Sequence, residues 1–483
     1  MSFRVLKVSI DGQEHELSYP LNGDENYITV MTGKNGSGKS SILEFISSNF
    51  VKNDDFLRYH PERWSRGFNK ISDGYNENTI TYKSGGYKVV AKELSKELAM
   101  AFISRAHPEN RYEVFPTKLI CLSTSPFDRF PANKRRLKYE NDEEVLESIY
   151  TYIGLKSSAS SLSVKSLINN VIDSILKSPD RIRSNIDVIK DTLSYLGYGK
   201  RIRLTFKSNM PPSTLFSGDK SAVLDWLINN HCIEPNLSFN EQTDKLLLAT
   251  STLRAKHNNV KGQFSVSIRL SEEHILNDEY IASVRMLLSS GVIRMMGFKL
   301  SLKEDNRKFI TFSHASSGEQ CLALMMLGIA SVIENNSLIC MDEPEISLHP
   351  KWQEEFIPMI QKAFNSYRGC HFIIATHSPL IISKLNSQNC SVLDLDRNEL
   401  VNKFNTTEFS SDYQLATLFK APGFKNQYLV NECLDILSHL SKSADAEASI
   451  MTRSKKVIEL ISTLDENDPV YSLASTIQKV IEE

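Results

Sequence analysis

The segment from Gly33 to Ser40, GKNGSGKS, constrains the fold most strongly, because it is a complete G-x-x-x-x-G-K-S phosphate-binding loop. The apolar, β-branched stretch Tyr27–Thr32 precedes it and predicts a buried strand, and Ser41–Ile46 predicts the first turns of a helix. In this order, backbone N–H groups and a helix N-terminus converge on phosphate. We therefore expect Lys39 to reach the β- and γ-phosphates of a nucleotide and Ser40 to bind Mg²⁺. The other predicted nucleotide-binding residues here are Asn35, Gly36, Ser37, Gly38 and Ser41.

Two later strands supply polar residues for the same chemistry. Ser337–Met341 predicts a buried strand that ends in Asp342 and Glu343. At this place Asp342 would hold Mg²⁺ through water, and Glu343 would polarise the attacking water. The next buried strand ends at His377, whose imidazole would hydrogen-bond a γ-phosphate oxygen. The predicted catalytic residues are Lys39, Glu343 and His377.

The order of these parts resembles the ABC-type ATPases of the SMC, RecF and OLD group. Their signature motif at a helix start is matched by the segment Ser317–Gln320, SGEQ, which we call the signature segment. The resemblance covers about residues 1–140 and 298–396. It implies an α/β head with a mixed sheet flanked by helices, and ATP and Mg²⁺ as cofactors. It also implies ATP sandwiched between two subunits, so that Ser317 and Gly318 reach the γ-phosphate held by the other subunit. Glu319 is grouped with them as an ATP-binding residue.

The Q-loop is where the sequence departs from this group. Its members usually carry a glutamine at a strand end between the phosphate-binding loop and the signature, but no glutamine occurs between Gln13 and Gln242. The predicted strand Lys118–Ser123 ends instead in hydroxyl and carboxylate side chains. We expect one of them to substitute on Mg²⁺ or on the lytic water, with slow hydrolysis as a consequence. The candidates are Ser123, Ser125 and Asp128.

The pattern of elements predicts four parts. They are an N-terminal lobe (1–143), a mainly helical insertion (144–297), a C-terminal lobe (298–396) and a helical C-terminal extension (397–483). Helical spacing of apolar residues predicts helices from Leu162 to Ile175 and from Val89 to Ile103. A hairpin is expected around Asp11-Gly12. The apolar face of the last helix favours core packing and subunit docking equally.

Composition limits the other functions. The net charge is −2, so contact with DNA needs a local basic patch, and the run Lys134–Lys138 is one candidate. No stretch approaches the ~20 apolar residues of a membrane span, and the N-terminus lacks the apolar region of a secretory signal. The seven cysteines are scattered, which predicts reduced thiols and a cytoplasmic protein.

Three stretches are similar to the PtuA family, the ATPase subunits of Septu and retron-associated anti-phage defence systems. They are Leu122–Phe130, Tyr152–Lys156 and Glu343–Trp352. This resemblance implies a homo-oligomer and a separate nuclease subunit, such as the HNH-type PtuB. The tail after Leu395 is too short and too helical for the TOPRIM nuclease domain of OLD proteins, so we expect no nuclease activity in this chain.

The function implied is an ATP-binding and ATP-hydrolysing subunit that controls a separate nuclease according to its nucleotide state. Three alternatives stay open: an AriA-like defence sensor, a RecF-like DNA-repair ATPase that binds DNA directly, and a scaffold that ATP only locks. The nucleotide subunit of a membrane transporter is rejected, because Ser317 lies about 280 residues after Lys39, against roughly a hundred in transporters.

Overall fold

The computed structural model describes most of the chain. The described residues are 2–19, 23–59, 78–92, 99–102, 111–132, 148–154, 164–217, 219–230, 239–257, 262–383, 385, 389–402, 416, 422–441 and 448–482. The predicted basic run Lys134–Lys138 lies outside them. Within these ranges, no helix combines the length and the apolarity that crossing a membrane demands.

A seven-stranded sheet forms the centre of the molecule, in the order β16-β15-β3-β14-β13-β7-β8. All neighbouring strands are parallel except the pair β15 and β16. The strands are β3 (Tyr27–Thr32), β7 (Leu119–Ser123), β8 (Tyr150–Gly154), β13 (Leu338–Asp342), β14 (His371–Ala375), β15 (Cys390–Asp394) and β16 (Glu399–Asn402). The five inner strands β3, β7, β13, β14 and β15 are buried throughout, as expected for parallel strands covered on both faces. Their carboxyl ends meet at one edge, which brings the predicted site residues together. The α/β head expected from the sequence is confirmed.

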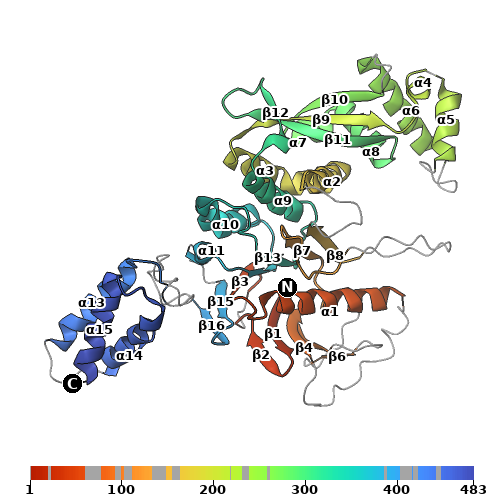
Figure 1. Cartoon of the computed structure of the whole chain (residues 1–483). Helices are drawn as coiled ribbons and strands as arrows, with labels where there is room; N and C mark the ends of the chain where they lie inside the picture. Colours follow the sequence, from red (N-terminus) through yellow and green to blue (C-terminus); the bar gives the residue numbers. More distant parts are fainter. Residues whose placement is uncertain are drawn as a thin grey trace.

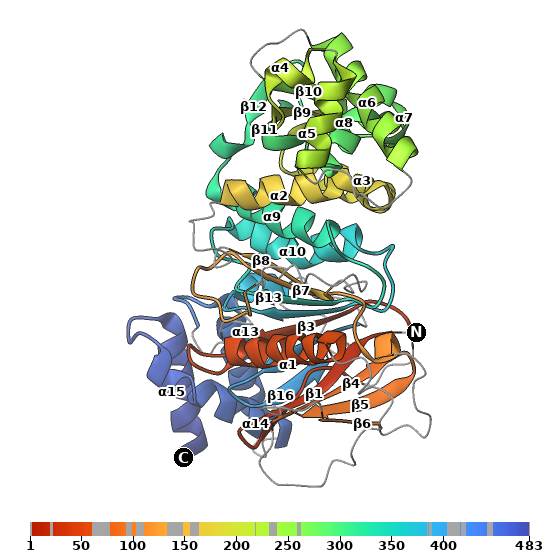
Figure 2. The same cartoon turned by 90° about the vertical axis from the view of Figure 1, so that its right-hand side faces the viewer.

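A second sheet lies below the first, with the order β2-β1-β4-β5-β6 and antiparallel pairing (Figure 2). Its strands are β1 (Arg4–Ile10), β2 (Gln13–Glu16), β4 (Thr79–Ser84), β5 (Tyr87–Lys92) and β6 (Ala99–Phe102). Helix α1 (Lys39–Tyr59) runs between the two sheets, and Leu43 and Phe50 share a core with Phe3 and Tyr82. The expected hairpin at Asp11-Gly12 is present, with φ values of 50° and 80°.

The expected helix from Val89 to Ile103 is wrong, because this segment contributes to β5 and β6. A short apolar run such as this one fits the helical period of 3.6 residues and the strand period of two equally well. The strand conformation is adopted because β5 pairs with β4 and β6, and this pairing satisfies the backbone N–H and C=O groups of the paired residues.

Helices make up most of the regular structure in the insertion, as the sequence predicted, but the insertion also holds a sheet that the sequence analysis did not predict. It contains a four-stranded antiparallel sheet in the order β10-β9-β11-β12. The strands are β9 (Tyr198–Ser208), β10 (Gln263–Arg269), β11 (Ile293–Leu302) and β12 (Phe309–Thr311). The helices are α2 (Val164–Lys177), α3 (Pro179–Tyr195), α4 (Pro212–Leu215), α5 (Lys220–Asn229), α6 (Phe239–Lys256), α7 (Glu272–Asn277) and α8 (Glu279–Ser289). Polar and apolar residues alternate along β10 and, from Arg201 onward, along β9, and burial follows the same period of two. This alternation is the signal that was missed.

Two expected boundaries also shift. Strand β8 pairs with β7 in the central sheet although it lies beyond residue 143, and β11 crosses the boundary at 297. The four-part division otherwise stays a prediction. Helices α2 and α3 lie between the insertion sheet and the head, against α9 (Ser317–Ala330) and near α10 (Pro350–Ala363) (Figure 1). One continuous apolar core runs from the central sheet through α9 to the insertion sheet.

Within the described residues 422–441 and 448–482, the chain forms three α-helices, as expected: α13 (Gln427–Leu440), α14 (Ala448–Ile458) and α15 (Pro469–Glu482). They enclose a core of their own. Val470, Ala474 and Ile477 on α15 are buried in it, whereas Val480 is exposed. Most of the apolar face of the last helix therefore packs inside its own unit.

Candidate nucleotide-binding site

The phosphate-binding loop joins the buried strand β3 to α1. Gly36 and Gly38 have φ values of 83° and 94°, which glycine adopts at no steric cost. The Lys39 side chain folds back over the loop. Its Nζ donates to the carbonyl oxygens of Gly33 (2.8 Å) and Lys34 (3.0 Å) and to Ser37 Oγ (3.2 Å). Phosphate oxygens can take the place of these acceptors, so the loop already holds an ammonium group where a nucleotide would need it.

Ser40 and Asp342 connect the two halves of the site. Ser40 Oγ donates to Asp342 Oδ1 at 3.1 Å, although the residues are far apart in the sequence. Asp342 is 6% exposed, and burial raises its pKa to about 6, against the opposing effect of the Ser40 hydrogen bond. A hydroxyl and a carboxylate oxygen form the hard donor set that Mg²⁺ prefers, so these two residues fit the ion that the fold implies.

Glu343 lies at the end of β13 and turns out of the strand. Its φ is +49°, an unusual value for a residue other than glycine, while its N–H still bonds to Ala375 O at 2.9 Å. Glu343 Oε1 comes within 3.5 Å of His377 Nε2. Burial and the nearby Lys39 ammonium lower the pKa of His377, and Glu343 opposes this change. The two predicted catalytic side chains therefore face each other, and Glu343 is held in a strained backbone conformation of the kind that clusters at active sites.

Sequence reasoning gave no role to Glu345, which the structure places behind His377. The His377 backbone N–H donates to Glu345 Oε1 at 2.6 Å, and Glu345 Oε2 is buried with no hydrogen-bond partner in the described structure. Burial raises the pKa of Glu345. Ser378 Oγ next to it donates to Gln353 Oε1 at 2.6 Å. Glu345, which follows β13, thus holds the loop that carries His377. In the sequence, the acidic pattern D-E-P-E after the predicted strand was the signal that could have pointed to Glu345.

The signature segment begins α9 with a capping box. Glu319 Oε2 accepts the Ser316 N–H and Oγ–H at 2.7 Å and 2.8 Å, and the Glu319 N–H bonds back to Ser316 Oγ. Ser317 is exposed. A Cβ on Gly318 would lie 2.6 Å from Ser347 O, so only glycine lets α9 approach this segment. Contact between the signature segment and a second subunit's nucleotide stays a prediction.

The candidate Q-loop substitutes have different surroundings. Ser123 Oγ lies 3.4 Å from Asp342 O and accepts the Ser125 N–H at 3.1 Å. Ser125 Oγ in turn accepts the backbone N–H of the highly exposed Phe127. Ser123 is therefore next to the acidic strand end.

Asp128 is turned into the protein. Asp128 Oδ2 accepts the Tyr152 hydroxyl at 2.6 Å, and Oδ1 accepts the Phe130 N–H at 3.0 Å. Its neighbour Arg129, which the sequence reasoning did not single out, donates to Ser41 Oγ at 3.1 Å. A direct role of any of these residues on Mg²⁺ or water stays a prediction.

The chain is similar to proteins that are described as probable ATPases. A family model described as "AAA domain, putative AbiEii toxin, Type IV TA system" matches residues 156–383, slightly less than half of the chain. The chain is 23% identical over 412 residues to "Retron Vc95 probable ATPase" from Vibrio cholerae serotype O1 biovar El Tor, covering 81% of this chain and 73% of the relative. It is 23% identical over 400 residues to "Retron Ec83 probable ATPase" from Escherichia coli, covering 76% and 66%. The matched part thus spans about two thirds to three quarters of these relatives.

The phosphate-binding loop between β3 and α1, together with the central sheet of mostly parallel strands, gives the chain a P-loop α/β fold. Solved structures similar to it include an SMC head domain from Thermotoga maritima, at 11% identity and a TM-score of 0.32, covering 81% of this chain and 93% of that one. The Smc head domain from Pyrococcus furiosus bound to the C-terminal domain of ScpA has the same identity and TM-score, covering 83% and 96%. The ATPase resemblance read from the sequence is confirmed, whereas the specific assignment to the PtuA family stays a prediction.

Proposed function

We propose that this ATPase-fold chain binds and hydrolyses ATP and that its nucleotide state controls a separate nuclease subunit in an anti-phage defence assembly. The observation that carries the ATPase part is the Ser40–Asp342 hydrogen bond, because it joins the phosphate-binding loop to the acidic strand end. A chance glycine turn would not meet a buried carboxylate in this way. Similarity to two retron ATPases supports the defence setting.

The side chains suggest a division of labour. Lys39 and the loop N–H groups bind the phosphates, and Ser40 with Asp342 holds Mg²⁺. Mg²⁺ held there would supply positive charge against the phosphates. Glu343 orients the attacking water, and the neutral His377 beside it donates a hydrogen bond to a γ-phosphate oxygen. Glu345 holds the His377 backbone from behind, so the imidazole stays in position.

Control of a partner needs surfaces that change with nucleotide state. The signature segment is joined to the insertion, because β12 leads through Phe312 directly into α9. Phe312 stacks on Phe298 at 5.2 Å and lies 5.8 Å from the Tyr198 ring. Nucleotide bound between two subunits would therefore shift the insertion together with the signature segment. The insertion and the helices α13–α15 are the candidate docking surfaces for the nuclease subunit.

The test is co-purification of the chain with the product of the adjacent gene, followed by a plasmid-nicking assay across ATP concentrations. Lys39→Ala is expected to block ATP binding, and Glu343→Gln is expected to keep ATP bound without hydrolysis. The nicking activity of the partner should therefore be high with one variant and low with the other. If the partner cuts DNA identically in both variants, nucleotide does not control it. If the chain alone degrades DNA, the assignment of cleavage to a separate subunit is wrong.

A further inference from the structure

One face of the insertion sheet is basic from end to end. Apolar side chains of β9, such as Ile202, Leu204 and Phe206, are buried against the helices α2, α3, α6, α7 and α8. The alternate side chains point to the opposite, solvent-exposed face, and pairing aligns them with exposed residues of β10 and β11. We call the basic members of this set the basic face: Arg201, Arg203, Lys207, Arg269, Arg294 and Lys299.

Carboxylates do not neutralise the basic face. The four strands of the sheet contain no aspartate or glutamate. Within the part of the chain that the structure describes, none of the six side chains forms an ion pair. Arg203 instead lies 4.1 Å above the Phe309 ring, which leaves the N–H groups at the edge of its guanidinium available.

The face also holds like charges directly opposite one another. Arg201 pairs across the strands with Arg269, and Arg203 with Lys299. A third such pair is formed by Lys207 and Arg294. Like charges in directly opposed positions destabilise a sheet. The chain has a net charge of −2, yet three like-charge pairs lie on one exposed face. Binding of an anionic partner would explain why this unfavourable arrangement is present.

We propose that the basic face binds the phosphate backbone of a nucleic acid. Arg201 and Lys207 are six residues apart on β9, so the face is about 20 Å long, or about six base-pair steps of duplex DNA. Guanidinium groups bind phosphate through paired N–H donors. Between the charged rows, the Thr205 and Ser265 hydroxyls, which hydrogen-bond each other at 3.1 Å, add further partners for phosphate oxygens.

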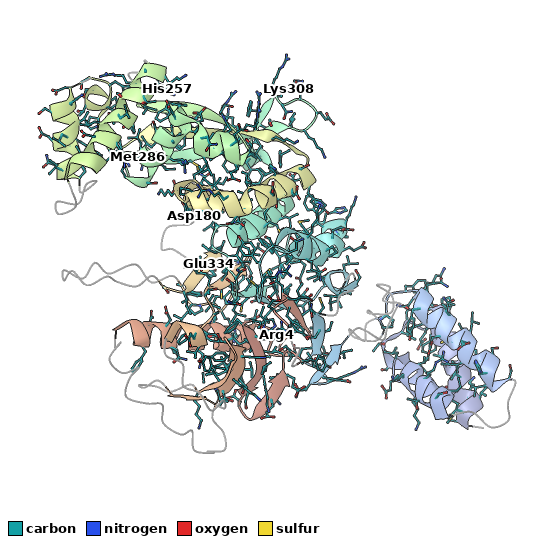
Figure 3. All side chains as sticks on the ribbon, turned by 180° about the vertical axis from the view of Figure 1, so that it is seen from behind. Arg4, Asp180, His257, Met286, Lys308 and Glu334 are labelled. Atoms are coloured by element: carbon teal, nitrogen blue, oxygen red, sulfur yellow. The ribbon has the colours of Figure 1, made fainter. Side chains whose placement is uncertain are left out.

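The composition of the basic face distinguishes this partner from an acidic protein. Protein interfaces have an apolar centre, usually with aromatic anchors. The centre of the basic face is formed by Thr205, Ser265 and Gly297, with the exposed Met296 next to it, and its aromatic residue, Phe309, lies under the Arg203 guanidinium. Hydroxyls surrounded by cations favour a backbone of phosphates. The basic face lies at the end of the molecule remote from the phosphate-binding loop, near the β11–β12 turn that Lys308 marks in Figure 3.

The test is fluorescence anisotropy of the full chain with a labelled 30-base-pair DNA duplex and the corresponding single strand, without ATP, between 50 and 200 mM salt. If all six cations contact duplex phosphates, log K should fall with log salt with a slope of about −5. Arg203→Gln with Lys299→Gln should weaken binding at least tenfold at 100 mM salt and reduce the slope by about 2. The matched control is Lys455→Gln with Lys456→Gln on α14, which removes the same charge from another exposed surface.

A second measurement separates loss of a ligand site from loss of the fold. Relief of like-charge repulsion should raise the thermal midpoint of the Arg203→Gln, Lys299→Gln variant at low salt, while the control leaves it unchanged. The proposal fails if the wild-type chain binds neither DNA form, or if both double variants lose equal affinity. It also fails if vesicles with anionic lipids bind the basic face and DNA does not. None of these readouts depends on ATP hydrolysis, so the proposed ATPase function is tested separately.

Discussion

Asp342→Asn should make the nucleotide-free protein more stable at neutral pH, even though it removes a residue that we assign to Mg²⁺. Burial raises the pKa of Asp342 from 3.8 to about 6, the Ser40 hydrogen bond opposes this, and the carboxylates of Glu343, Asp128 and Glu345 add to it. The folded state therefore favours the protonated carboxyl. As pH rises from 4 through 6, the unfolded chain loses this proton first, and the free energy of unfolding falls.

The magnitude follows from the two pKa values. Their difference corresponds to about 3 kcal/mol of unfolding free energy lost at pH 8, and to roughly half of that at pH 5. Asparagine cannot ionise, and its amide oxygen still accepts the Ser40 hydrogen bond. The variant should thus exceed the wild type in stability by an amount that is about 1.4 kcal/mol larger at pH 8 than at pH 5. Asp225→Asn, at an exposed position on α5, is the matched control for the loss of one carboxylate.

The assay is hydrogen exchange of the β13 amides in increasing urea, without Mg²⁺, at both pH values. This probe reports on the central sheet and avoids the separate core of α13–α15. Addition of Mg²⁺ and ATP at a thousand times their dissociation constant should then stabilise the wild type by about 4 kcal/mol, and the variant far less. A variant that is less stable than the wild type at pH 8 without Mg²⁺ would refute the reasoning, as would a difference that does not shrink at pH 5.

Four further outcomes are expected. Lys39→Ala should abolish ATP binding by calorimetry with an unchanged circular dichroism spectrum; full affinity in the variant would remove the phosphate-loop assignment. Glu343→Gln should bind ATP normally but hydrolyse it at least about 10²-fold more slowly in a phosphate-release assay, and a wild-type rate would place the general base elsewhere. Lys39→Ala and Ser317→Arg chains, each inactive alone, should regain part of their ATPase activity when mixed, unless the site is not shared between subunits. Glu345→Ala should lower kcat with little change in KM, while Glu345→Gln, which keeps the acceptor for the His377 N–H, should restore it; equal loss in both variants would show that the carboxylate itself is needed.

Much of the nucleotide site could be predicted because its parts are local. The phosphate-binding loop, the end of β13 and the end of β14 each show a buried strand followed by polar residues, and parallel pairing brings such ends to one edge. The sequence therefore located Ser40, Asp342 and His377 without long-range information. The spacing of these motifs did not require knowledge of the insertion.

The contacts that the sequence did not reveal depend on partners that are distant in the sequence. Asp128 fits a Q-loop substitute by position, yet its carboxylate accepts the hydroxyl of Tyr152 from β8, a strand that was not expected in the central sheet. The Glu345 contact with the His377 N–H likewise depends on the pairing of β13 with β14. In the insertion, β9 alternates cations with apolar residues over a short stretch. The longer helical patterns on both sides of it predict helix for the segment as a whole.

The two electrostatically unfavourable parts of the molecule are connected by the fold. At one end, the buried Asp342 lies among acidic neighbours; at the other, the strands of the basic face pair cations with cations and contain no carboxylate. Between them, the Tyr198 phenol at the start of β9 faces the Glu319 carboxylate of the signature segment, and burial together with this charge raises the pKa of Tyr198 to about 12. Glu319 also caps α9, so the start of β9 lies beside the residue that orders the signature segment. An anion bound on the basic face would relieve repulsion within β9, β10 and β11, and one strand and one helix cap join that face to the signature segment.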